Sequence, residues 1–112
     1  MRIKLRDNTL KWTIYIYIDY TYSDYCDEID IEYEEVHWLL GQSNFIDWLS
    51  HIYIGDKNDL PTIIHELLHW VNRILDQKWI TIDEELQCYL QEFYFREYLR
   101  KTKLCGHNIN RN

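Results

Sequence analysis

Hydrophobic positions along the chain follow two different periods, and the change from one to the other divides the sequence in two. Near the N-terminus, apolar and polar residues alternate most clearly from Trp12 to Asp19, which is the pattern of a half-buried strand. From residue 60 onward the apolar residues recur every three or four positions, as on an amphipathic helix. The pattern therefore predicts an α+β fold, with a small antiparallel or mixed sheet packed against a pair of helices.

The first half, residues 1–55, is predicted to be mostly sheet. Asp7-Asn8 is a turn signal between two strand-like segments, and the tyrosines of the second strand are expected to line a solvated face of the sheet. Alternation at 29–33 also fits the start of a strand, although the spacing of apolar residues over the longer segment favours a helix ending at Gly41. The predicted elements are strands at 2–6 and 11–22, a loop at 23–28, a helix at 29–40, and strands at 44–49 and 51–55.

The second half is predicted to be two helices, over 59–78 and 81–103, followed by a polar tail at 104–112. Asp59 is a good N-cap for the first helix, with Pro61 in its first turn. Thr81 and Glu84 have the spacing of a capping box at the start of the second. Because only a short link separates the helices, they should pack antiparallel. The apolar face of the first helix is expected to contain Ile64, Leu67, Leu68, Val71, Ile74 and Leu75.

Composition narrows the class of protein. The 112 residues suffice for a single domain, 1–112, and a net charge of −7 argues against a nucleic-acid-binding surface. Three cysteines without a C-x-x-C pair are typical of free thiols in a reducing cytoplasm. No apolar run is long enough to span a membrane, so we expect a cytoplasmic protein with neither membrane nor nucleic-acid partners. Alanine is absent, which indicates an A/T-biased genome such as that of a virus or plasmid.

The first helix of the second half contains the motif H-E-x-x-H, formed by His65, Glu66 and His69. Residues four apart lie on the same face of a helix, so both imidazoles can reach one metal ion. Glu66 is about 100° further round the helix, where its carboxylate would lie beside the ion without binding it. That position suits a general base acting on water at the metal.

A zinc site of this kind needs a third protein ligand, which the helix over 81–103 should provide. Glu84, Glu85, Cys88 and Glu92 are the candidates. Glu84 projects toward water and is used in the capping box, whereas Glu85, Cys88 and Glu92 share a face beside the apolar stripe. Glu85 is favoured, with the other three as alternatives.

These residues resemble the pattern of the gluzincin metallopeptidases, in which H-E-x-x-H is followed on a later helix by a glutamate ligand. The matching segments are 65–69 and 85–89, and the resemblance, strongest to short phage-type and ImmA-like enzymes, covers about residues 50–103. It implies a zincin-like helix pair, zinc as cofactor, His65, His69 and Glu85 as ligands, and Glu66 as the catalytic residue. Cys88 departs from the pattern because it stands where the family usually has alanine.

The expected function is a zinc-dependent hydrolase that cleaves a peptide or protein substrate. The strand at 51–54 resembles the edge strand that pairs with substrate in these enzymes, and His51 or Tyr89 are candidates for stabilising the oxyanion. The alternative is a catalytically inactive zinc-binding protein that acts as an interaction module, from a virus or plasmid. Exposed aromatic strands also allow a homodimer through edge-to-edge pairing.

Overall fold

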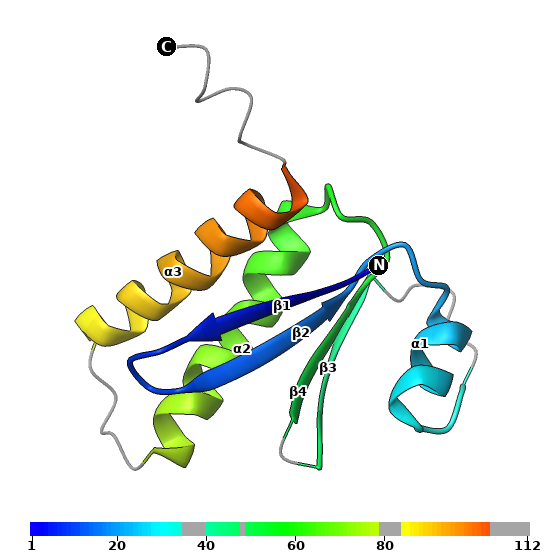
Figure 1. Ribbon diagram of the computed structural model, residues 1–112, viewed down its shortest axis with the longest axis horizontal. Coiled ribbons are helices and arrows are strands. Elements are labelled where there is room, and N and C mark those ends of the chain that lie inside the picture. The colour runs from blue at the N-terminus through cyan, green and yellow to red at the C-terminus, as the bar shows by residue number, and fades with distance from the viewer. Residues whose placement is uncertain (35–39, 48, 79–83, 104–112) are drawn as a thin grey trace.

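A four-stranded sheet lies across two long helices, and a short third helix packs near one end of the sheet (Figure 1). The computed structural model describes residues 1–34, 40–47, 49–78 and 84–103. In chain order the elements are β1 (Arg2–Asp7), β2 (Trp12–Tyr17), α1 (Tyr22–Ile29), β3 (Gly41–Ile46), β4 (Leu49–Ile54), α2 (Leu60–Gln77) and α3 (Glu84–Thr102).

The sheet is mixed, with the strand order β1-β2-β4-β3. β1 pairs antiparallel with β2, β2 parallel with β4, and β4 antiparallel with β3. The predicted α+β class with a mixed sheet and a helix pair is confirmed. The predicted hairpin at the N-terminus is also confirmed, and its turn is closed by the Asp7 carboxylate, which accepts hydrogen bonds from the backbone N–H groups of Thr9 and Leu10.

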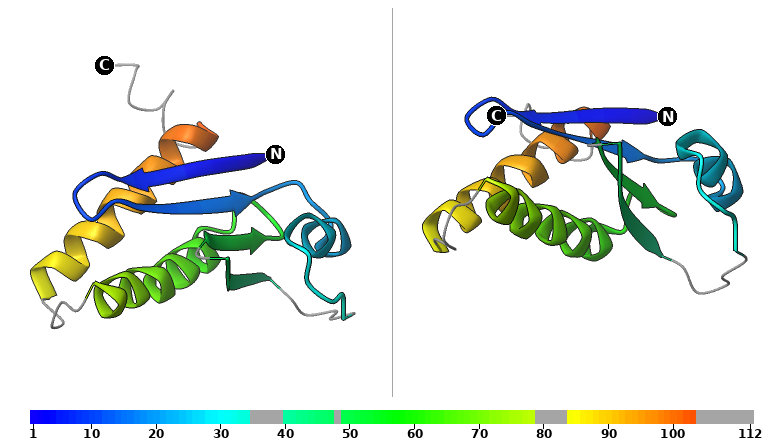
Figure 2. Two further views of the ribbon diagram at one scale, coloured as in Figure 1. Left: turned by 60° about the horizontal axis from the view of Figure 1, so that its bottom comes forward. Right: turned by 90° about the horizontal axis from the view of Figure 1, so that it is seen from below.

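One face of the sheet packs on α2 and α3, which lie side by side against it (Figure 2). The alternation in the sequence explains why this face is apolar, because every second residue of a strand points to the same side of the sheet. The residues that point toward the helices are fully buried: Ile14 and Ile16 of β2, and Ile52 and Ile54 of β4. The helices contribute Ile63, Leu67, Trp70, Val71, Ile74, Leu75, Leu90, Tyr94 and Tyr98 to the same core.

The opposite face of the sheet is not the solvated tyrosine face that the sequence predicted. Tyr17 is only 1% exposed and packs with Tyr53 against Tyr25 and Cys26 of α1. The segment 23–28, predicted as a loop, is most of α1, whose N-cap is Thr21. Its buried stripe is too short to stand out against the acidic residues around it, and the helix covers the aromatic surface that β2 was expected to expose.

The helix predicted over 29–40 is wrong in its described part. α1 ends at Ile29, and Asp30 stops it with a left-handed backbone conformation (φ 58°). Residues 31–34 form no helix, residues 35–39 lie outside the described part, and Gly41 begins β3 instead of ending a helix. β2 likewise ends at Tyr17, because the chain must turn there to enter α1.

The two long helices agree closely with the prediction where they are described. Asp59 caps α2 by accepting a hydrogen bond from the Thr62 backbone N–H (3.3 Å), and α2 ends within a residue of the predicted position. The proposed cap Thr81 and the tail 104–112 lie outside the described residues. The apolar face differs in one respect: Ile64 and Leu68 are 42% and 40% exposed, because they lie beside a surface groove between α2 and α3 instead of in the core.

Two hydrogen bonds confirm that α2 and α3 are antiparallel. Gln87 Nε2 donates to Asn72 Oδ1 (2.6 Å), and Gln91 Nε2 donates to the Ile64 carbonyl (2.9 Å). The later residue of α3 therefore contacts the earlier residue of α2. These contacts set the level at which each residue of α3 passes the H-E-x-x-H motif.

We expect the stability of the fold to depend on pH through His51. Its Nδ1 is hydrogen-bonded to the Tyr17 hydroxyl (2.8 Å), and burial, followed by the nearby Arg2 charge, lowers the pKa of His51 below its ordinary value. As pH falls below about 6.5, the unfolded imidazole takes up a proton that the folded one resists, so stability should fall. Urea unfolding of His51→Gln between about pH 5 and 6.5 should show a shallower pH slope than wild type. Identical slopes would contradict this assignment.

Candidate metal centre

His65 and His69 project from the exposed side of α2, and their rings approach one another. The two Nε2 atoms are 3.1 Å apart, and the rings meet edge to face with centroids 4.7 Å apart. Two nitrogens bound to one tetrahedral zinc at about 2.0–2.1 Å would be separated by roughly 3.3 Å. The expected convergence of the imidazoles is therefore confirmed, at a spacing that fits a single ion.

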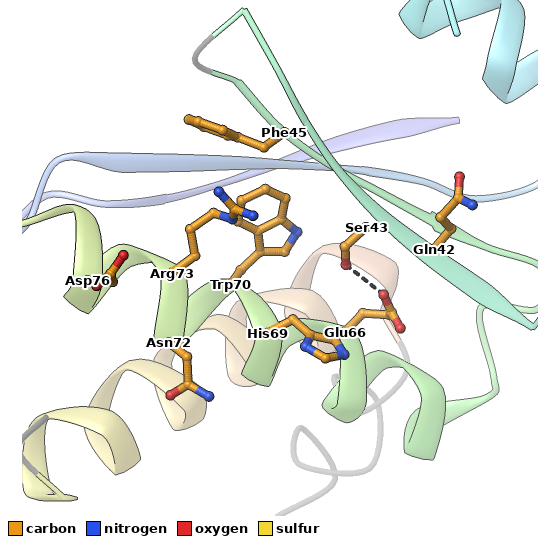
Figure 3. A pocket seen from close by; sticks show the side chains of 9 residues that line it. All are labelled: Gln42, Ser43, Phe45, Glu66, His69, Trp70, Asn72, Arg73 and Asp76. Carbon is orange, nitrogen blue, oxygen red and sulfur yellow. Dashed lines mark hydrogen bonds between the residues drawn. The ribbon is translucent and has the colours of Figure 1, made fainter. Parts of the chain in front are cut away.

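Glu66 lies between these imidazoles and the sheet, and its carboxylate is anchored at one end. The residue is 7% exposed, and its Oε1 accepts a hydrogen bond from the Ser43 hydroxyl of β3 (2.6 Å; Figure 3). Its Oε2 lies 3.8 Å from His65 Nε2. One carboxylate oxygen is thus held by the sheet, and the other faces the imidazoles, as a base beside a metal ion would require.

Ser43 was not identified from the sequence as part of the site. It is separated from Glu66 by 23 positions in the chain, and a single serine on a polar strand carries no local signal of its partner. Its hydroxyl holds one oxygen of the Glu66 carboxylate in place, as a group that orients a functional carboxylate would.

Gly41 lets β3 approach α2 closely enough for this contact. A Cβ added at Gly41 would lie 2.7 Å from Thr62 Cγ2, 3.2 Å from the Tyr53 carbonyl oxygen and 3.4 Å from Glu66 Cγ. Thr62 cannot easily turn aside, because its hydroxyl donates to Asp59 Oδ2 (2.6 Å). The absence of a side chain at Gly41 is therefore what permits the distance between strand and helix.

Replacing Gly41 with alanine should destabilise the fold by about 1–3 kcal/mol, because the added methyl overpacks the contact between β3 and α2. Urea unfolding measures the change. Leu40→Ala is the matched control, since Leu40 is 64% exposed immediately before β3 and its truncation should have little effect. Equal stability of Gly41→Ala and wild type would show that the strand can shift without cost.

A cleft of about 650 Å³ runs between β3 and α2 beside His69 (Figure 3). Trp70 forms part of its wall; the residue is 2% exposed, and its indole nitrogen has no hydrogen-bond acceptor within the described residues. The cleft is lined by Gln42, Ser43, Phe45, Glu66, His69, Trp70, Asn72, Arg73 and Asp76.

The strand along this cleft is not the one that the sequence suggested. The segment 51–54 belongs to β4, which is paired with β2 on one side and β3 on the other, so it cannot accept a further strand. β3 is the edge strand instead. Its register with β4, together with the bond from Gly55 N–H to the Leu40 carbonyl (3.0 Å), directs the backbone groups of Gly41 and Ser43 toward the outer edge of the sheet, where no other described strand is paired.

The third ligand is not brought into the group formed by His65, Glu66 and His69. Within the described residues, these are the three whose ligand atoms lie within 4.8 Å of one another, and they do not include Glu85. Glu85 is exposed at the start of α3, two residues before Gln87, which contacts Asn72 beyond His69. Its assignment as a ligand stays a prediction.

The alternative ligands lie at different levels of α3. Gln87 and Gln91 mark positions opposite Asn72 and Ile64, so Cys88, between them, passes α2 near the level of the histidines. Glu92 is the residue after Gln91 and pairs with Arg96 at the surface. Glu84 is exposed in the first turn of α3.

The two candidates for stabilising an oxyanion lie in different surroundings. His51 alternates with Ile52 along β4 and faces the side of the sheet opposite α2, where it contacts Tyr17 and Tyr15. His51 is therefore not placed to stabilise an oxyanion beside Glu66. Tyr89 is 50% exposed on α3, and its predicted role is untested.

Comparisons with known proteins give no family for this chain. No family model, no curated protein and no solved structure matches it. In the described ranges, none of the helices combines the length and the hydrophobicity that crossing a membrane requires.

Proposed function

We propose that this protein is a zinc-dependent hydrolase of the reducing cytoplasm, and that its substrates are peptides. The observation that supports this most directly is the pair of imidazole nitrogens 3.1 Å apart beside a carboxylate anchored by Ser43. If the two histidines lay together by chance, there would be no reason for the buried Glu66 beside them to be hydrogen-bonded to the neighbouring strand. Cys26 and Cys88 are free thiols, in keeping with a reducing compartment.

His65 and His69 would hold the ion, with one ligand from α3, for which Glu85 is our first choice. Bound zinc would polarise a substrate carbonyl and lower the pKa of a water molecule. Glu66 Oε2 then accepts a proton from the attacking water and passes it to the leaving amine. Ser43 keeps the carboxylate facing the imidazoles while this proton moves.

The free edge of β3 supplies a way to orient the substrate. An extended peptide can pair with the outward backbone groups of β3, among them those of Ser43, adding a fifth strand beside the cleft. Main-chain pairing fixes the position of the peptide bond without requiring a particular side chain. The scissile carbonyl would then lie next to Glu66, which contacts Ser43 directly.

The second candidate function is an inactive zinc-binding interaction module. The observation that favours it is the position of Glu85 outside the group of ligand atoms formed by His65, Glu66 and His69. In such a protein Glu66 would serve as a ligand in place of a base, and the exposed histidines would bring metal to a surface that contacts a partner.

Metal analysis and peptide hydrolysis separate these functions. Untagged protein purified without added metal should contain about one equivalent of zinc, and zinc-loaded protein should cleave members of a broad peptide library. Zinc binding without any cleavage would favour the interaction module. Less than a tenth of an equivalent of zinc, with no change in melting temperature on adding chelator, would exclude both.

A further inference from the structure

Arg73 lies in the cleft one turn of α2 beyond His69 (Figure 3). Its guanidinium carbon is 5.1 Å from the centroid of the Phe45 ring and 5.4 Å from that of the Trp70 ring. Both distances are within the range of cation–π contact. The two aromatic rings thus hold the cation beside the edge strand, while the residue stays exposed to solvent and accessible to a ligand.

Arg73 has no anionic partner among the described residues. Their ion pairs join His65 with Glu66, Glu92 with Arg96, and Glu97 with Arg100. Asp76 lines the same cleft, but its carboxylate is more than 4.0 Å from the guanidinium. Stacking occupies the faces of a guanidinium and leaves its edge N–H groups free, and these form a fork that matches a carboxylate.

We propose that Arg73 determines substrate specificity by binding a carboxylate of the peptide, an inference that rests on the proposed hydrolase function. Four residues of helix separate Arg73 from His69, which is about 6 Å along the axis. An extended peptide advances about 3.3 Å per residue. The bound carboxylate therefore belongs to a residue about two positions from the bond that is cleaved.

The direction of β3 identifies the side of the cleaved bond on which this residue lies. β3 runs from Ser43, beside Glu66, to Phe45, beside Trp70 and Arg73. A peptide paired antiparallel to β3 runs the other way, so its residues N-terminal to the cleaved bond pass Arg73. Antiparallel pairing is slightly the more stable, which favours an Asp or Glu side chain there. A parallel peptide would instead present its C-terminal carboxylate.

Matched peptides distinguish these two sources of the carboxylate. One pair differs by Glu or Gln at the second position before the cleaved bond, and another by a C-terminal acid or amide. Wild-type protein should cleave the Glu peptide about tenfold to hundredfold faster than the Gln peptide, as expected for a charge-assisted hydrogen bond. A preference for the C-terminal acid alone would assign the carboxylate to the parallel peptide.

Variants at Arg73 test whether it is the residue responsible. Arg73→Gln should lose the preference by slowing only the carboxylate peptide, and Arg73→Lys should keep part of it because the charge remains without the planar fork. Arg100→Gln is the matched control, since Arg100 is exposed on α3 and pairs with Glu97, which is no candidate ligand. An undiminished preference in Arg73→Gln, or equal cleavage of both members of each pair by wild type, would overturn the inference.

Calorimetric binding of the same peptides to zinc-loaded protein gives a readout that does not depend on cleavage. Dissociation constants should show the preference of wild type for the carboxylate peptide and its loss in Arg73→Gln. Binding preference without hydrolysis of any peptide would defeat the proposed function while supporting the role of Arg73. Hydrolysis with equal binding of all the peptides would support the proposed function and defeat the role of Arg73.

Discussion

Glu66→Gln should abolish peptide hydrolysis, with a loss of about 10²–10⁴-fold in kcat, and leave zinc bound at its wild-type stoichiometry. The amide cannot accept a proton from water, so the step assigned to the carboxylate is lost. Its oxygen can still accept the hydrogen bond from Ser43, which preserves the position of the side chain. Steady-state kinetics with a cleaved library peptide and elemental analysis measure the two quantities.

The control for this substitution is Glu28→Gln on α1. Glu28 is exposed and lies outside the cleft, so the same change of chemistry there should alter neither rate nor metal content. Hydrolysis by Glu66→Gln at the wild-type rate would contradict the role of general base. Loss of zinc together with activity would instead identify Glu66 as a ligand, which is the arrangement expected of the interaction module.

Local patterns predicted those parts of the fold whose contacts are local. α2 followed from its apolar spacing and from Asp59, whose side chain caps a backbone N–H three residues away. The hairpin of β1 and β2 followed in the same way from alternation and a turn. α1 was missed because its eight residues offer only a short buried stripe, and that stripe is stabilised by Tyr17 and Tyr53 on distant strands.

The same distinction between local and distant contacts decides which residues of the site the sequence could predict. His65, Glu66 and His69 occur within five positions of a helix, so their convergence follows from helical geometry alone. Ser43, Gly41 and Arg73 could not be assigned from the sequence, because their roles depend on β3 being the edge strand beside α2. Strand order is decided by pairing between distant segments. Because β3 is polar, the alternation of apolar and polar residues predicted only part of it.

The third ligand illustrates a limit of a different kind. Choosing among residues on α3 by helical face compares their angles but not their levels along the helix. Those levels are set by Gln87 and Gln91, whose bonds to α2 fix the register of the pair. Neither glutamine carried a signal of its partner in the sequence. A side-chain face was therefore predictable, whereas the register that brings it past the histidines was not.

His69→Ala should lower zinc affinity by more than about 100-fold, because removing a ligand should exceed the 10–100-fold cost of losing a group that orients one. Added zinc stabilises wild type in proportion to its binding, so its effect on the melting temperature should vanish in the variant. His65→Ala should behave alike. His51→Gln is the control, since His51 faces the other side of the sheet.

The same titration identifies the third ligand from Glu85→Gln, Cys88→Ser and Glu92→Gln. The true ligand should reproduce the loss seen in His69→Ala, while the other two substitutions leave affinity within a few-fold, because those side chains are exposed on α3. A loss confined to Cys88→Ser would move the ligand to the level of α3 nearest the histidines and replace Glu85. If none of the three variants binds zinc more weakly, Glu84 is the remaining candidate on α3, and Glu66 is the carboxylate already grouped with the two histidines.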